Sequence, residues 1–342
     1  MKIRIFSPKT CLNPSIGYHI PLLFPFWGEG EKGNGQSFDV DSFKEWLKSG
    51  HLFFQLVNSI EESDIVVLPY EWRQGYAAAF DLAHTADTHN KPFVIFFDSD
   101  STENIPIENA IIFRTSFNKS EQKKNEHAYP GCTTDLTIKL PAGKTSLRKK
   151  NTIPVIGYTG YIDYRNPWEY VKYITRYVRH PGMDQTGQHL RGNCVRNLSL
   201  SSLVKTHFYL RDGCKTGSAT LKERQEFIQS ILESDYSLVC RGGGNFSYRL
   251  YEVLSLGRIP LFIDTDCVLP YDDIIDWKRF CLWVDCKDVK ELDRIVADFH
   301  DRISDDDFKA MQQEARNIFE QWICPTGFYK NLWRYIPGLR VE

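Results

Sequence analysis

Hydrophobic positions along the chain fall into two kinds of segment. Short apolar runs, typical of strands, occur at 3–6, 64–68, 92–97, 110–114, 154–158, 207–210, 236–240, 260–263 and 280–284. Apolar residues recur with a helical period at 42–56, 77–89, 167–178, 221–233, 246–256, 289–299 and 306–323. Buried strands that alternate with helices are typical of parallel sheets with helices on both faces. The pattern therefore predicts an α/β protein.

This series of strands and helices occurs twice, and a polar, basic stretch at 144–150 lies between the two copies as a candidate linker. The length of 342 residues also favours two domains over one. We expect a Rossmann-like domain over 1–143, a second over 151–303, and C-terminal helices over 304–342 that pack back across the domains. Two doubly wound halves are expected to hold a ligand in a cleft at the carboxyl ends of their strands.

Composition and charge narrow the possible partners and the compartment. Hydrophobic residues make up 42% and charged residues 25%, which suits a globular protein. The formal charge of -2 gives no general attraction to nucleic acid, so we expect no nucleic-acid partner. The nine cysteines contain no C-x-x-C pair, and no run of 18 apolar residues occurs. We therefore expect a cytoplasmic protein.

The sequence RGGGN at residues 241–245 is the strongest candidate for chemistry. It stands between an apolar strand-like run and a helix, where glycine backbone can come close to a ligand. A helix N-terminus reached in this way attracts anions. The pattern predicts a nucleotide diphosphate site, although a flexible corner would also contain three glycines, and neither G-x-x-x-x-G-K-[ST] nor G-x-G-x-x-G is present. The expected binding residues are Gly160, Arg211, Arg241, Gly242, Gly243, Gly244, Asn245, Ser247, Arg249 and Glu252.

Each side chain in this set has an expected role. Arg241 and Arg249 can make charge-assisted contacts with phosphate oxygens, and Arg211 can assist them. Glu252 lies about one turn into the helix, where it can accept hydrogen bonds from sugar hydroxyls. Asn245 or Ser247 can cap the helix.

The segment SDYSLVCRGGGNFSYRLYEVLSLGRIPLFIDTDCVLPYDDIIDW, residues 234–277, resembles the signature of exostosin-type glycosyltransferases, family 47 of the sugar transferases. An Arg-Gly loop, a Ser-x-Arg-x-x-Glu helix, a Gly-x-x-Pro strand and a Leu-Pro-Tyr segment carry the resemblance, which is nearest to the bacterial or viral type. The resemblance implies a GT-B architecture, in which two Rossmann-like domains face a cleft. It also implies an inverting transfer from a nucleotide-diphosphate sugar, of which a UDP-sugar is the expected donor, with no prosthetic group. Arg241 and Arg249 would bind the diphosphate, and Glu252 the ribose or sugar.

The expected acceptor is a glycan or a lipid-linked oligosaccharide, in the synthesis of a surface polysaccharide or a glycoprotein glycan. An inverting transfer needs a base that takes a proton from this acceptor. The candidates are Glu71, Asp98, Asp100 and His19, which follow strand-like runs or lie in loops of the first half. Glu71 is the first choice, although each of the four also suits an ordinary polar loop position.

Two other functions remain open. Residues 98–100 and 264–266 each match D-x-D, a pattern with which metal-dependent sugar transferases hold a divalent ion. We expect no metal, because arginines and a helix dipole can neutralise a diphosphate on their own. A protein that binds a nucleotide sugar or a glycan without catalysis would also fit the pattern.

The C-terminal sequence FEQWICPTGFYKNLWRYIPGLR mixes aromatic and basic residues. Such a segment can make a weak peripheral contact with a membrane. Because its charge density is low, the sequence favours the alternative that Trp322, Trp333 and Tyr335 pack against the protein itself.

Overall fold

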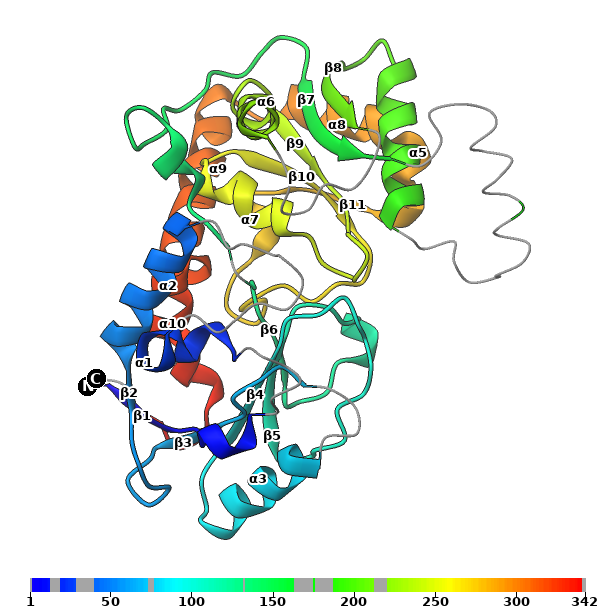
Figure 1. The fold of residues 1–342 in the computed structure, drawn as a ribbon. Helices are drawn as coiled ribbons and strands as arrows, with labels where there is room; N and C mark the ends of the chain where they lie inside the picture. Colours follow the sequence, from blue (N-terminus) through cyan, green and yellow to red (C-terminus); the bar gives the residue numbers. More distant parts are fainter. Residues whose placement is uncertain are drawn as a thin grey trace. The chain divides into compact units, whose positions relative to one another are not determined.

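The computed structural model describes residues 2–12, 19–28, 40–72, 77–131, 133–162, 175, 187–211 and 220–339. The chain divides into two compact units (Figure 1). The first unit combines Met1–Thr134 with Val268–Asp272 and Glu320–Glu342, and the second combines Asp135–Cys267 with Asp273–Phe319. Each unit contains a parallel sheet with helices, so the predicted α/β class is confirmed. The expected cleft stays a prediction.

The sheet of the first unit has six parallel strands in the order β2-β1-β3-β4-β5-β6. Their bounds are β1 Ile3–Phe6, β2 Phe54–Leu56, β3 Ile65–Val67, β4 Phe93–Phe97, β5 Ala110–Arg114 and β6 Glu126–Ala128. Every residue of β3, β4 and β5 is buried, because neighbouring strands and layers on both faces shield these three from water.

Helices cover this first sheet with apolar stripes. Helix α3 (Ala77–Thr88) buries Ala79, Leu82 and Ala86 in a core shared with β3, β4 and β5. Helices α2 (Val40–Phe53) and α10 (Pro325–Asn331) lie side by side although they are far apart in sequence (Figure 1). A hydrogen bond of 2.8 Å joins Ser49 Oγ and Thr326 Oγ1 between them. The short helix α1 (Phe24–Trp27) packs against α2.

The sheet of the second unit has five parallel strands in the order β11-β10-β9-β7-β8. Their bounds are β7 Val155–Tyr161, β8 Lys205–Arg211, β9 Tyr236–Val239, β10 Ile259–Asp264 and β11 Leu282–Asp285. The chain runs from β7 to β8 in one direction and then returns through β9 to β11 in the other. This reversal is a topological switch point of a doubly wound fold, where ligands bind at the carboxyl ends of the strands.

The helices of the second unit form two layers. Helices α6 (Leu221–Leu232) and α7 (Tyr248–Ser255) pack on one face, and α5 (Gly187–Leu200) and α8 (Leu292–Arg302) on the other (Figure 1). Helix α9 (Asp305–Ile318) contacts α7 and β10.

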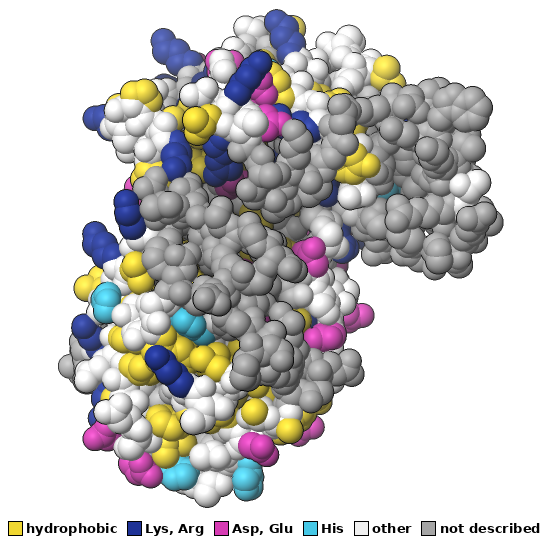
Figure 2. Space-filling model, viewed as in Figure 1, with side chains coloured by type: hydrophobic (Ala, Val, Ile, Leu, Met, Phe, Trp, Pro, Cys, Tyr) yellow, Lys and Arg dark blue, Asp and Glu magenta, His cyan; other side chains and the backbone are white. Residues whose placement is uncertain are grey.

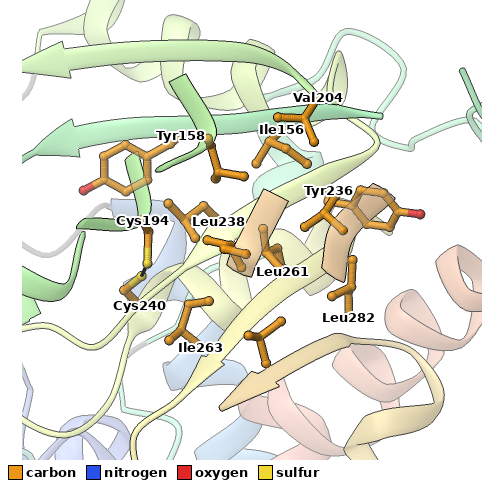
Figure 3. Packing of buried hydrophobic residues seen from close by; sticks show 14 of the residues in the cluster. Ile156, Tyr158, Cys194, Val204, Tyr236, Leu238, Cys240, Leu261, Ile263 and Leu282 are labelled. Atoms are coloured by element: carbon orange, nitrogen blue, oxygen red, sulfur yellow. Dashed lines mark hydrogen bonds between the residues drawn. The ribbon is translucent and has the colours of Figure 1, made fainter. Parts of the chain in front are cut away.

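The core between the sheet and α5 is apolar and includes two thiols that face each other (Figure 3). Cys194 on α5 and Cys240, just after β9, are both buried, with their Sγ atoms 3.8 Å apart. Burial raises the pKa of the Cys194 thiol, so it is protonated. The seven cysteines in the described part of the chain are thiols rather than disulfides.

Some expected elements differ from those observed. The helix expected over 42–56 ends at Phe53, and its last three residues form β2. The strand expected over 154–158 continues to Tyr161 in β7. A Cβ at Gly157 would lie 2.5 Å from Ser230 O and from Ser234 Oγ, so this glycine permits close packing of α6 against the strand.

The C-terminal part of the chain also departs from the expectation. The helix expected over 306–323 ends at Ile318 in α9, and a π-helical turn, Phe319–Ile323, follows it. Strand β6 and helix α10 were not predicted. The helix expected over 167–178 lies outside the described residues except for Thr175.

The candidate linker over 144–150 is held within the second unit. The backbone N–H of Arg148 donates to Gln312 Oε1 at 2.9 Å. Lys150 Nζ donates to the carbonyl oxygens of His300 and Ile303 at 2.9 and 2.7 Å.

The C-terminal aromatic residues pack within the first unit. Tyr335 stacks on His127 with ring centroids 4.1 Å apart, and Trp322 contacts Tyr271 at 5.1 Å. The Arg334 guanidinium lies 5.0 Å from the Trp333 ring centroid. Among the described residues, the helices are all too short or too polar to cross a bilayer. The weak membrane contact stays a prediction.

Candidate functional site

The glycine loop, residues 241–245, connects β9 to α7 at the carboxyl edge of the second sheet. The N–H of Gly242 donates to Phe246 O at 2.8 Å and closes the loop. Ser247 occupies the N-cap position of α7, but its side chain makes no capping hydrogen bond. The expected capping hydrogen bond from Ser247 is therefore absent.

Asn245 has a different role from the expected cap. Its side chain is fully buried, Nδ2 donates to Thr265 O at 3.0 Å, and Oδ1 accepts from Thr265 Oγ1 at 2.7 Å. Thr265 follows β10, the strand next to β9. Asn245 therefore ties the glycine loop to the loop of the neighbouring strand and fixes its position.

The three glycines are not required by the local backbone. None of Gly242, Gly243 and Gly244 has a positive φ, so L-residues with side chains could adopt the same conformation. Glycine at such positions leaves the peptide groups uncovered for a close approach from outside. Arg241 adds positive charge beside them, and its Nη2 lies 3.5 Å from Gly243 O.

Arg249, in the first turn of α7, is held in place by aromatic rings. Its guanidinium carbon lies 4.3 Å from the ring centroid of Tyr158 and 5.6 Å from that of Phe227. Nη2 donates to the carbonyl oxygen of Thr159, while the buried Nε has no hydrogen-bond partner. A buried charged donor without an acceptor is costly and suits a site that an anion completes.

Gly160 leaves room for this arrangement. A Cβ there would lie 3.0 Å from the Tyr158 hydroxyl oxygen and 3.1 Å from Arg249 Nη2, and the φ of +155° is one that L-residues rarely adopt. The structure thus brings together Gly160 and Arg249, two of the predicted residues. The structure adds Tyr158, which the sequence analysis treated only as part of an apolar strand.

Glu252 lies one turn along α7 and is paired with a cation. Its Oε1 is 3.0 Å from Arg224 Nη1, and the Arg224 guanidinium lies 5.3 Å from the ring of Phe227. Arg224 and Phe227 both belong to α6 and were not predicted. Their spacing of three residues places them on one helix face, but only the fold reveals that this face meets α7.

Arg211 at the end of β8 is already neutralised. Its guanidinium forms ion pairs with Glu223 at 3.0 Å and with Glu226 at 3.2 Å, both on α6. A phosphate would have to compete with these two carboxylates. The role of Arg211 on the diphosphate stays a prediction.

The candidate bases belong to the carboxyl edge of the first sheet. Glu71 follows β3, and Asp98 and Asp100 follow β4, the neighbouring strand. The N–H of Ile20, next to His19, donates to Pro69 O beyond β3 at 3.0 Å. The structure therefore brings the four candidates to one edge of their sheet, and the choice of Glu71 stays a prediction.

His19 is the most enclosed of the four. Its Nε2 donates to Gly28 O at 2.8 Å, and its ring packs edge-on against Phe24 and Trp27. Burial lowers the pKa of His19, so the ring is neutral at neutral pH. With the proton on Nε2, Nδ1 keeps a lone pair.

A buried ion pair fixes the loop that carries Asp98 and Asp100. Arg114 Nη1 lies 2.8 Å from Glu126 Oε1, and both side chains are almost fully buried. Arg114 Nη2 also donates to Ser101 O at 3.0 Å. Arg114 is the last residue of β5 and Glu126 is the first residue of β6. Their pairing could be recognised only once the fold showed that these two strands are adjacent.

The D-x-D pattern at 264–266 is used for local structure. Asp264 Oδ1 accepts from the N–H of Asp266 at 2.9 Å, and Oδ2 accepts from Trp283 Nε1 at 3.2 Å. Both oxygens are thus engaged. Within the described ranges, no group of three or more His, Cys, Asp or Glu side chains is arranged to hold a metal ion.

A comparison with known families finds a match to part of the second unit. Residues 182–299, which include the glycine loop and α7, match the family model of the Exostosin GT47 domain. This part of the chain is similar to the exostosin GT47 domain. This match confirms the resemblance inferred from the segment at 234–277.

Individual relatives also align with this chain, each over a short segment. Exostosin-1 of Drosophila melanogaster is 28% identical over 100 residues, which are 29% of this chain and 13% of that protein. The protein named "Probable beta-1,4-xylosyltransferase IRX10" of Arabidopsis thaliana is 36% identical over 70 residues, which are 20% of this chain and 17% of that one. The matched part is thus a small fraction of each relative.

Among solved structures, an Anabaena protein, HepE, in complex with UDP and glucose aligns with a TM-score of 0.39 and 11% identity. The alignment covers 98% of this chain and 99% of that one.

Proposed function

We propose that this protein is an inverting glycosyltransferase that moves a sugar from a nucleotide-diphosphate sugar, with a UDP-sugar as donor, to a glycan acceptor. The exostosin GT47 domain supports a sugar transfer, as do relatives that are named exostosin and xylosyltransferase. The acceptor would belong to a surface polysaccharide or a glycoprotein glycan and could be lipid-linked. We place the reaction in the cytoplasm, as inferred from the sequence.

The observation that carries this proposal is the environment of the Arg249 guanidinium. Its guanidinium lies on the Tyr158 ring near the start of α7, and its buried Nε has no hydrogen-bond acceptor. The neighbouring loop offers glycine peptide groups whose backbone does not require glycine. A diphosphate would supply hydrogen-bond acceptors to the Arg249 guanidinium and to the glycine N–H groups. The helix dipole would favour its negative charge.

The remaining residues have roles that follow from this position. Glu252, oriented by Arg224, would accept hydrogen bonds from the ribose or sugar hydroxyls. Glu71 is our first candidate for the base that takes the acceptor proton, ahead of Asp98, Asp100 and His19. Stabilisation of the leaving diphosphate by Arg249 and Arg241 requires no metal and no prosthetic group.

Calorimetric titration of the full chain with UDP tests the proposal. Arg249→Ala should weaken UDP binding by roughly 1.5–3 kcal/mol, about 10- to 150-fold, because a charge-assisted contact is lost. Arg294→Ala is the matched control, since Arg294 is an exposed arginine on α8 that pairs with the exposed Glu291. Equal UDP affinity in the Arg249 variant and the wild type would contradict the proposal.

A further inference from the structure

A second pocket lies in the second unit, away from the glycine loop. Its volume is about 520 Å³. Its lining includes the end of α6 and Arg258, which precedes β10. These positions belong to the amino edge of the sheet, whereas the glycine loop follows the carboxyl end of β9. A strand of six residues such as β10 spans roughly 20 Å, so the two sites are separate.

Arg258 is the central feature of this pocket. Its side chain is 5% exposed, and no carboxylate pairs with it in the described chain. Nε donates to Leu232 O, and Nη1 donates to the carbonyl oxygens of Ser146, Leu256 and Gly257, at 3.1 to 3.4 Å. All four acceptors are neutral. Nη2 takes part in none of these bonds, which leaves it for a ligand.

The charges around the pocket are not balanced. Lys144 and Arg148 line it together with Arg258, and Lys and Arg side chains also gather on the visible surface of this unit (Figure 2). Of these three cations, only Arg148 has an acidic partner within the described residues, Asp235, at 3.2 Å. Burial, and then the charge of Arg148, lower the pKa of Arg258 to about 10. An anion in the pocket would relieve this repulsion.

The rest of the lining suits the body of a small polar molecule. Thr145 and Ser146 supply hydroxyl groups, and Leu232 contributes to an apolar wall. A volume of about 520 Å³ lies within the range of small-molecule sites, roughly 300–1,000 Å³.

We propose that this pocket binds a sugar-sized ligand that carries an oxyanion, either a phosphate or a carboxylate. Arg258 Nη2, Lys144 and Arg148 hold the anionic group, and the hydroxyl and apolar residues contact the sugar. The site is independent of the transferase site proposed above.

Titration calorimetry of the full chain tests this with three probes: glucose 6-phosphate, glucuronate and inorganic phosphate. Glucose, which has no charge, is the negative probe. Wild type should bind at least one anionic probe and not glucose. Tighter binding of glucose 6-phosphate would identify the anionic group as a phosphate, and tighter binding of glucuronate would identify it as a carboxylate. Binding of inorganic phosphate alone would overturn the proposal that the ligand is sugar-sized.

Three variants locate the binding. Lys144→Ala lies at an exposed position and should not affect folding. It should lower the affinity for the bound probe at least 5-fold. Lys149→Ala removes an exposed cation of the same segment outside the pocket and should change affinity less than 2-fold. Arg249→Ala should leave the affinity for the probe unchanged. Equal losses in the two lysine variants, or a loss only in Arg249→Ala, would overturn the proposal.

Discussion

At the scale of single residues, the candidate site depends on how Arg249 is held. The guanidinium is fixed by the Tyr158 face, by the Thr159 carbonyl and by the space that Gly160 leaves. A flexible arginine would lose side-chain entropy on binding an anion, whereas one that is already ordered loses less. Tyr158 is therefore a positioning residue for Arg249.

Tyr158→Leu should weaken UDP binding by about 0.5–2 kcal/mol, because the cation–π contact is lost. Tyr158→Phe keeps the ring and loses only the hydrogen bond to Tyr161 O, so it should bind UDP like the wild type. Calorimetry measures affinity, and thermal unfolding reports stability separately. If Phe and Leu lower affinity equally, the ring has no positioning role.

Residue contacts of this kind could not be predicted from the sequence. Tyr158, Arg224 and Arg249 come from β7, α6 and α7 and are as many as 91 positions apart in the chain. Only the strand order β9-β7-β8 brings these elements together. The glycines and Arg249 could be found because they stand within one short segment beside a predicted helix start.

At the scale of elements, the first residue of α5 packs against the glycine loop. A Cβ at Gly187 would overlap the carbonyl oxygens of Arg241 and Gly242. Helix α5 therefore packs directly against the loop. Cys194 of α5 and Cys240, which precedes the loop, add a second contact between the two segments (Figure 3). The position of the loop is thus coupled to a helix that precedes it by about 40 residues.

Gly187→Ala should displace the loop, weaken UDP binding and lower the melting temperature. The expected loss of stability is about 1–3 kcal/mol, as for other overpacked sites. Leu200→Ala, at the exposed end of the same helix, is the control and should leave both quantities unchanged. Wild-type affinity in Gly187→Ala would show that the loop does not rely on this contact.

The elements themselves were predicted where the apolar signal was strong. The buried runs in β3, β4, β9 and β10 contain no polar alternation, and each was expected. Strand β6, with the sequence EHA, was missed because its Glu126 is buried by pairing with Arg114. Strand β2 was missed because its three residues continue the helical pattern of α2.

At the scale of the whole molecule, the proposed reaction needs groups from both units. The residues proposed to bind the diphosphate belong to the second unit, and the candidate bases belong to the first. Binding and transfer should therefore respond to different substitutions. This separation also distinguishes an enzyme from a protein that only binds nucleotide sugars.

Glu71→Gln should leave UDP affinity unchanged and slow sugar transfer by roughly 10²- to 10⁴-fold, the usual contribution of a general base. Transfer is measured as UDP release from a panel of UDP-sugars in the presence of glycan acceptors. Glu62→Gln, at an exposed loop position of the same unit, is the control. Unchanged transfer in Glu71→Gln would move the role to Asp98, Asp100 or His19.

The most direct test of the central claim is a crystal structure of the full chain with UDP. The account predicts a diphosphate beside Gly242, Gly243 and Gly244, with a phosphate oxygen within hydrogen-bond distance of the Arg249 guanidinium. UDP bound elsewhere, or an Arg249 side chain without contact to the diphosphate, would contradict it.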